Sequence, residues 1–171
     1  GAGNTKGVSV TTDLISTTDQ IKINGVQLGA TLSDTAGAKA DAINLISSES
    51  GVTASAETIV FLDLDFDVTA TNTSFEINGE PILVAALNGI SDVAAAINAQ
   101  SVGVQATATA EGLLKLTDTG GGNISIDMSS LTTYVAFAYD SQFDVVTPAA
   151  AMEVFGSISL NSTNGGVIKL E

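Results

Sequence analysis

The side chains in this sequence that are best suited to chemistry are carboxylates. Asp63, Asp65 and Asp67 occupy alternate positions of an apolar run. Three gathered carboxylates could bind Ca²⁺, which prefers oxygen ligands, but an EF-hand loop also needs a turn glycine and a downstream glutamate, and neither is present at the required spacing. Because residues at every second position of a β-strand share a face, the triplet is more simply a solvated strand face. We therefore expect no metal site.

The residue inventory argues against an enzyme. The chain has no His, no Cys and no Arg. It therefore lacks the commonest general base, the thiol nucleophile and the bidentate anion clamp. A hydrolase working through two carboxylates that converge in a cleft remains as an alternative. We expect no catalytic residue and no cofactor.

The glycine run at 120–122 could wrap a phosphate. A phosphate-binding loop continues into Lys-Ser or Lys-Thr and then a helix, and this run does neither. We predict a hairpin turn at these glycines instead.

The charge balance restricts the possible partners. Nineteen acids stand against five lysines, which gives a net charge of −14. Such a chain repels phosphate backbones and anionic membrane surfaces, so we expect neither nucleic acid nor membrane as a partner. The same charge favours solubility at high local concentration.

One pattern of residues occurs twice. Each copy has Ile-Asn-Gly, then Ile-Asn twenty residues later, then Gly-Val followed two residues on by Ala. The offset between the copies is 54 residues at the asparagines and 52 at Gly-Val. Such a repeat indicates one structural unit used twice. The first copy is Ile23, Asn24, Gly25, Ile43, Asn44, Gly51, Val52 and Ala54; the second is Ile77, Asn78, Gly79, Ile97, Asn98, Gly103, Val104 and Ala106.

Each copy is expected to form strand, turn, strand, helix and strand. Asn-Gly is a strong hairpin-turn signal because both residues tolerate positive φ. Ser33 and Ser91 are predicted to cap the two helices, and Gly51 to end the first. The amides of the four repeated asparagines could bind sugar, but their places at turns and helix ends favour structural hydrogen bonds.

The remaining chain is expected to be mostly β-structure. Val8 and Val10 could form an edge strand, and strands are expected near 113–117, 123–128 and 134–143, with a terminal hairpin over Asn164-Gly165. The predicted fold class is α+β and β-rich, because each helix must cover one face of its small sheet. We expect a first unit at 1–60, a second at 61–130 and a closing β-rich segment at 131–171 that packs back on them.

The repeated pattern resembles the flagellin IN motif, in which a strand ends in Ile-Asn-Gly, an Ala-rich helix ends in Ile-Asn, and Gly-Val-x-Ala follows. Gly112–Leu116 resembles the family's next strand, and residues 155–168 resemble the last outer β segment of flagellins. Flagellins polymerise through long terminal helices, and the chain has no sustained apolar heptads. The resemblance therefore implies the outer, surface-exposed domains alone.

The resemblance implies a structural, secreted and extracellular component of the bacterial flagellar filament. Its partners would be other flagellin subunits, and its roles motility and antigenicity. The 37 Ser and Thr residues offer acceptors for sugars, as some flagellins carry. Without the polymerising helices, we expect the chain by itself to be a monomer.

Two further interpretations remain open. The family also places the motif in the filament cap and in hook-associated proteins. A carbohydrate-binding adhesin module would instead need an aromatic platform, which in this chain could only come from Tyr134, Phe137 and Tyr139, since Trp is absent.

Overall fold

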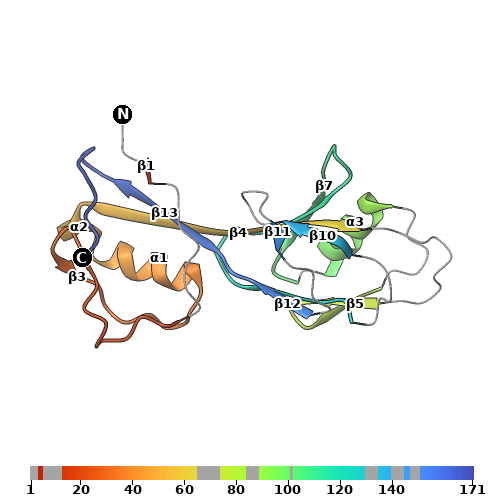
Figure 1. Ribbon diagram of the computed structural model, residues 1–171, viewed down its shortest axis with the longest axis horizontal. Helices are drawn as coiled ribbons and strands as arrows, with labels where there is room; N and C mark the ends of the chain where they lie inside the picture. The colour runs from red at the N-terminus through yellow and green to blue at the C-terminus, as the bar shows by residue number, and fades with distance from the viewer. Residues whose placement is uncertain are drawn as a thin grey trace. The chain divides into compact units, whose positions relative to one another are not determined.

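The computed structural model describes residues 4–5, 13–64, 74–83, 89–100, 102–129, 135–139, 145–146 and 151–171 (Figure 1). These residues are β-rich, form several antiparallel sheets and include a smaller helical part, in keeping with an α+β class. The chain divides into two compact units. Unit 1 comprises 1–57, 119–122 and 155–171, and unit 2 comprises 58–118 and 123–154.

This division differs from the predicted ranges at the C-terminal end. Residues 155–171 belong with the first copy of the repeat, and residues 123–154 belong with the second. The range 131–171 is therefore shared between the units. The boundary falls within one long strand, β4 (Val52–Leu64), whose residues 52–57 are part of unit 1 and 58–64 part of unit 2.

Unit 1 combines a short hairpin, two helices and an antiparallel strand group. The hairpin pairs β2 (Lys22–Ile23) with β3 (Val26–Gln27). Helices α1 (Ala36–Leu45) and α2 (Ser47–Ser50) follow. Strand β13 (Ser157–Ser162) pairs with β4 on one side and with β1 (Asn4–Thr5) on the other, and α1 packs against β13.

The core of unit 1 comes mainly from the first copy of the repeat. Its buried members are Ile23, Leu28, Ala42, Ile43 and Val52. Ala36, Ala40 and Ile43 of α1 are all buried, as their helical spacing predicts.

Helix α1 begins later than the sequence predicts. Its N-cap is Thr35, whose Oγ1 accepts a hydrogen bond from the Ala38 N–H at 3.2 Å, so the prediction of Ser33 was wrong. Ser33 instead hydrogen-bonds through its hydroxyl to that of Thr35. The side chain that can reach the free N–H groups of the first turn determines the cap.

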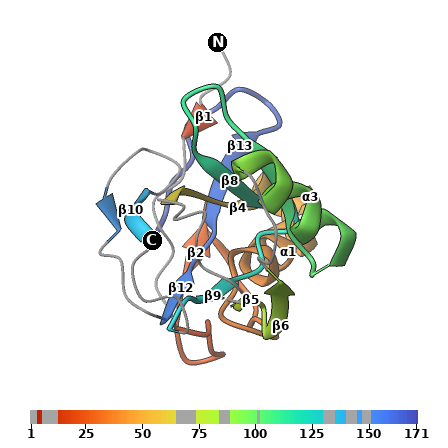
Figure 2. The ribbon, with the colours of Figure 1, turned by 90° about the vertical axis from the view of Figure 1, so that its right-hand side faces the viewer.

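The described residues of unit 2 form two antiparallel sheets. The first has the order β7–β8–β4–β10–β11, and the second β12–β9–β5–β6. Helix α3 (Ile90–Gln100) packs against β7 and β6, and Figure 2 shows α3 and β10 on opposite sides of β4. The strands are β5 (Ser74–Ile77), β6 (Glu80–Leu83), β7 (Gln105–Ala108), β8 (Leu114–Asp118), β9 (Ile124–Asp127), β10 (Val135–Tyr139), β11 (Val145–Val146) and β12 (Ala151–Val154).

The core of unit 2 lies between these sheets and α3. Ile77, Ile97 and Val104 of the second copy are buried in it. Val60 and Leu62 of β4 are buried too, while Phe61 and Asp63 between them are only partly buried. This alternation fits the half-buried strand that the sequence predicts. Asp65 and Asp67 lie outside the described residues, as do Val8 and Val10.

The glycine run at 120–122 does not form a hairpin turn, which corrects the prediction. The strands on either side, β8 and β9, belong to different sheets and do not pair with each other. The run lies against the start of α1, where the Gly37 N–H donates to the Gly121 carbonyl at 3.1 Å. A Cβ on Gly37 would overlap the Gly120 carbonyl oxygen, so glycine in this helix permits a close backbone approach.

Two further predictions of local structure were wrong. Helix α3 begins at Ile90, so Ser91 lies inside its first turn and does not cap it. The chain end does not fold back on β13 as a hairpin. Instead, Leu170 forms an antiparallel bridge with Ile23, and backbone hydrogen bonds join Lys22 to Glu171. The end of the chain therefore extends the β2–β3 hairpin by pairing with the backbone of β2.

Candidate functional site

The two Asn-Gly turns have the same backbone geometry. The φ angles are +50° and +81° at Asn24 and Gly25, and +53° and +78° at Asn78 and Gly79. Positive φ at both central residues defines the turn that matches the twist of a two-residue hairpin. The strands on either side pair as predicted, β2 with β3 and β5 with β6.

The first asparagine of each copy joins its turn to two distant segments. The Asn24 Nδ2 donates to the Ser50 carbonyl at 2.8 Å, and its Oδ1 accepts from the Lys169 N–H at 2.9 Å. The Asn24 N–H also donates to the Lys169 carbonyl at 2.9 Å. One side chain thus links the turn, the residue before Gly51 and the end of the chain.

The first asparagine of the second copy makes the same three bonds. The Asn78 Nδ2 donates to the Val102 carbonyl at 2.9 Å, and its Oδ1 accepts from the Ser125 N–H at 2.9 Å. The Asn78 N–H donates to the Ser125 carbonyl at 2.9 Å. Val102 precedes Gly103 as Ser50 precedes Gly51, so the bonds correspond residue by residue.

The second asparagine of each copy holds the strand that follows the helix. The Asn44 Nδ2 donates to the Ala54 carbonyl at 2.9 Å, and its Oδ1 accepts from the Ala54 N–H at 2.8 Å. Asn98 makes the matching pair with Ala106, both at 2.8 Å. Each amide therefore satisfies both backbone groups of the alanine in Gly-Val-x-Ala. We call the two asparagines of a copy, with these five hydrogen bonds, an asparagine bracket.

The other repeated residues shape the surroundings of each bracket. Gly51 and Gly103 have φ angles of +69° and +83°, which glycine adopts without strain. Gly51 also ends α2 in the left-handed conformation. The repeated isoleucines Ile23, Ile43, Ile77 and Ile97 and the valines Val52 and Val104 are all buried in the core of their own unit.

Sequence reasoning did not find the distant partners of the brackets. Lys169 lies 145 residues from Asn24, and Ser125 lies 47 residues from Asn78. Both contribute backbone groups, so their side-chain types carry no signal of the contact. Positive φ at Gly103 was likewise visible only as the spacing that the two copies share.

The bracket amides are occupied by hydrogen bonds to backbone groups. Among the residues that the structure describes, no three acidic side chains gather to hold a metal ion. Within the same residues, no helix has the length and apolarity needed to cross a bilayer.

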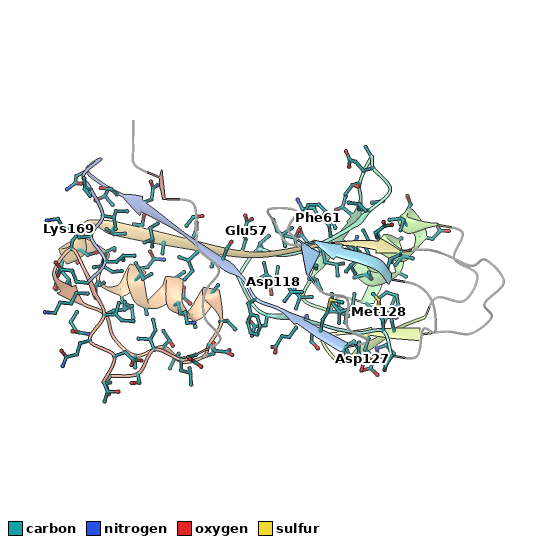
Figure 3. The ribbon with its side chains drawn as sticks, in the orientation of Figure 1. Glu57, Phe61, Asp118, Asp127, Met128 and Lys169 are labelled. Atoms are coloured by element: carbon teal, nitrogen blue, oxygen red, sulfur yellow. The ribbon has the colours of Figure 1, made fainter. Side chains whose placement is uncertain are left out.

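Among the residues that the structure describes, two ionisable groups have shifted pKa values, and neither belongs to a bracket. Burial lowers the pKa of Lys39 in α1, while the nearby carboxylates of Asp34 and Asp13 act in the opposite direction. Hydrogen bonds from the Ser129 hydroxyl and N–H lower the pKa of Asp127, with the N–H donating at 2.8 Å to Oδ1. Asp127 is the last residue of β9 (Figure 3), and its shift reflects the hydrogen bonds that Ser129 donates two residues further on.

Of the three residues considered for an aromatic platform, the structure describes the backbone of Phe137 and Tyr139. Tyr134 lies outside the described residues. Strand β10 places Tyr139 opposite Phe61 and Phe137 opposite Asp63 in the register with β4. On the other side of β4, the Lys115 Nζ lies 5.8 Å from the centre of the Phe61 ring, a cation–π contact.

No protein-family model matches this chain, and no curated protein matches it. A functional argument therefore starts from the repeated residues and the geometry of the two brackets.

Proposed function

We propose that this chain forms the outer domains of a bacterial flagellin, built from two IN-type units that project from the filament surface. Its role is structural, and it acts without catalytic residues, metal or cofactor. Its partners are other flagellin subunits, and its location is the extracellular filament. There it contributes to motility and presents an antigenic surface.

The correspondence of the two asparagine brackets is the observation that carries the proposal. Residues that resemble the flagellin IN motif are the residues that make the ten matched hydrogen bonds. A chance match of short sequence patterns has no reason to produce equal bonds at equal positions. The geometry thus gives the motif a physical role, which is to tie a turn, a helix end and a strand together.

The distribution of charge supports a role on a crowded filament surface. Unit 2 holds twelve acids and one lysine, a net charge of −11, while unit 1 holds seven acids and four lysines, a net charge of −3. Like charges at high density repel one another, which opposes bundling of neighbouring filaments. Unit 1, which carries little net charge, can lie close to neighbouring subunits at a smaller electrostatic cost.

Recovery of the parent protein tests this proposal. Filaments are sheared from cells that produce the chain, purified and digested, and their peptides are identified by mass spectrometry. The proposal expects peptides of this chain in the most abundant filament protein, joined to helical flanking segments. Their presence only in a scarce protein of the filament tip or the hook junction would assign the chain to the cap or hook-associated class. Absence from filaments would refute both assignments.

A carbohydrate-binding adhesin module is the second candidate. The observation in its favour is the strand register, which places Tyr139 beside Phe61 and Phe137 beside Asp63. Aromatic residues next to polar groups are suited to stacking on sugar rings. Titration of the protein with neutral and acidic oligosaccharides tests it. Saturable binding that Phe61→Ala abolishes would support this candidate, and no binding by the folded protein would refute it.

A further inference from the structure

Of the four Asn-Gly pairs in the sequence, three lie wholly within the described residues, and their side-chain amides make different hydrogen bonds. They are Asn24-Gly25, Asn78-Gly79 and Asn164-Gly165. In any Asn-Gly pair, the glycine nitrogen can attack the side-chain carbonyl carbon of the asparagine, because glycine offers little steric hindrance. Whether it does so in a folded protein depends on how firmly the side-chain amide is held.

The bracket asparagines are held at both ends of the amide. In Asn24 and Asn78, the Nδ2 donates to a backbone carbonyl at 2.8 and 2.9 Å, and the Oδ1 accepts from a backbone N–H at 2.9 Å. For the glycine nitrogen to attack, the side-chain amide must rotate towards it, and Nδ2 must then leave as ammonia. Both steps would break hydrogen bonds that the amide makes to the backbone.

Asn164 has the opposite arrangement. Its Oδ1 accepts two hydrogen bonds, from the Ser162 hydroxyl at 2.8 Å and from the Gly166 N–H at 2.9 Å. Its Nδ2 makes no hydrogen bond to any described residue, and the side chain is exposed. The bond from Gly166 folds the amide back over the peptide that follows Asn164. Two donors at Oδ1 stabilise the negative charge that develops there when the carbon is attacked.

We propose that Asn164 is a site of spontaneous, self-catalysed deamidation, whereas Asn24 and Asn78 are protected. The Gly165 nitrogen loses its proton to water and forms a bond to Cγ of Asn164. The Cγ–Nδ2 bond breaks and ammonia leaves, which gives a five-membered succinimide. Water then opens the ring at one of its two carbonyls, giving aspartate or isoaspartate. Water is the only co-reactant, and the step does not depend on the proposed flagellar function.

The modification would act on the first asparagine bracket. Thr163 donates to the Gly51 carbonyl through its N–H at 2.9 Å and its hydroxyl at 3.1 Å, and Lys169 binds Asn24. Residues 163 and 169 are thus both anchored to the first copy of the repeat. Isoaspartate lengthens the backbone between these anchors by one methylene. We therefore expect the modified protein to lose protection of the Lys169 amide.

Peptide mapping of the folded protein during incubation at mildly alkaline pH tests the proposal. Chromatography with mass spectrometry separates the aspartyl and isoaspartyl products at each Asn-Gly pair. Asn164 is expected to convert while Asn24 and Asn78 in the same molecules stay intact. The same incubation in denaturant should convert all three at similar rates. Equal conversion rates at the three pairs in the folded protein, or no conversion at Asn164, would overturn the proposal. It would also be overturned if Asn164 still converted faster than Asn24 and Asn78 in denaturant, because the difference would then not come from the fold.

Two variants separate the contributions. Ser162→Ala removes one donor to Oδ1 and is expected to slow conversion about five-fold, the equivalent of one ordinary hydrogen bond. Gly165→Ala hinders the attacking nitrogen, and its Cβ would meet no atom within 4 Å, although φ at this position is +73°. Circular dichroism verifies that each variant is folded. A folded Ser162→Ala protein that converts at the unchanged rate would refute the role of the Oδ1 donors.

Discussion

Removal of one bracket side chain should weaken its own unit and leave the matched site in the other unit unchanged. The most informative change is Asn78→Gly, because glycine keeps the positive φ of +53° without strain and removes only the amide. Two hydrogen bonds are lost, one to the buried Val102 and one from the exposed Ser125. At about 0.5–1.5 kcal/mol each, the expected loss of stability is about 1–3 kcal/mol.

Hydrogen–deuterium exchange followed at single amides by NMR measures this effect locally. In the Asn78→Gly protein, the Ser125 amide should exchange about 5- to 150-fold faster, which corresponds to that loss of free energy. The Lys169 amide, which is bound to Asn24 in the first copy, should keep its rate and serves as an internal control.

The reciprocal variant completes the test. Asn24→Gly should accelerate exchange at Lys169 and not at Ser125. Equal acceleration at both amides in either variant, or at neither, would refute the conclusion that each bracket is a separate structural tie. A further change, Asn78→Ala, should cost about 1–2 kcal/mol more than glycine because alanine is strained at positive φ.

Three other predictions follow from single contacts. Helix propensity alone would make Gly37→Ala stabilising by about 1 kcal/mol. Because the new Cβ would overlap the Gly120 carbonyl oxygen, the change should instead destabilise the protein by about 1–3 kcal/mol. Thermal unfolding shows whether the midpoint falls, as expected, or rises. Ser129→Ala should raise the pKa of Asp127 towards 3.8, which a carboxyl NMR titration measures. In the unchanged protein, the stabilisation from the depressed pKa is fully present above pH 3.8 and is lost as the pH falls through the lower folded pKa. Because burial lowers the pKa of Lys39, stability should rise with pH between that lowered value and 10.5, and Lys39→Met should abolish the rise in urea unfolding measured across that range.

Short-range features of the fold were predictable from the sequence. The Asn24-Gly25 turn, its counterpart at Asn78-Gly79 and the left-handed Gly51 follow from backbone preferences that few residues share. The buried face of α1 follows from helical spacing. These features depend on interactions within a few residues, so the sequence carries a direct signal of them.

Features that depend on contacts between distant segments were not predictable. The glycine run at 120–122 has the composition of a turn, yet it serves the close approach of Gly37. The end of the chain has the composition of a hairpin, yet its backbone pairs with Lys22 and binds Asn24. Ser33 is by type the slightly better cap, and only the geometry of the helix start selects Thr35.

The bracket partners show the same limit. The repeat indicated that Asn24, Asn44, Asn78 and Asn98 form structural hydrogen bonds, and the structure has all four doing so. Their acceptors and donors are backbone groups, which every residue possesses. Identifying Lys169 and Ser125 therefore required the fold itself.

Immunogold electron microscopy tests the proposed function most directly. Antibodies raised against the purified chain are applied to intact cells that produce it. The account predicts gold particles along the whole length of each flagellar filament, since every subunit would present these outer domains. Labelling confined to filament tips or to the hook junction, or labelling of the cell body with bare filaments, would contradict it.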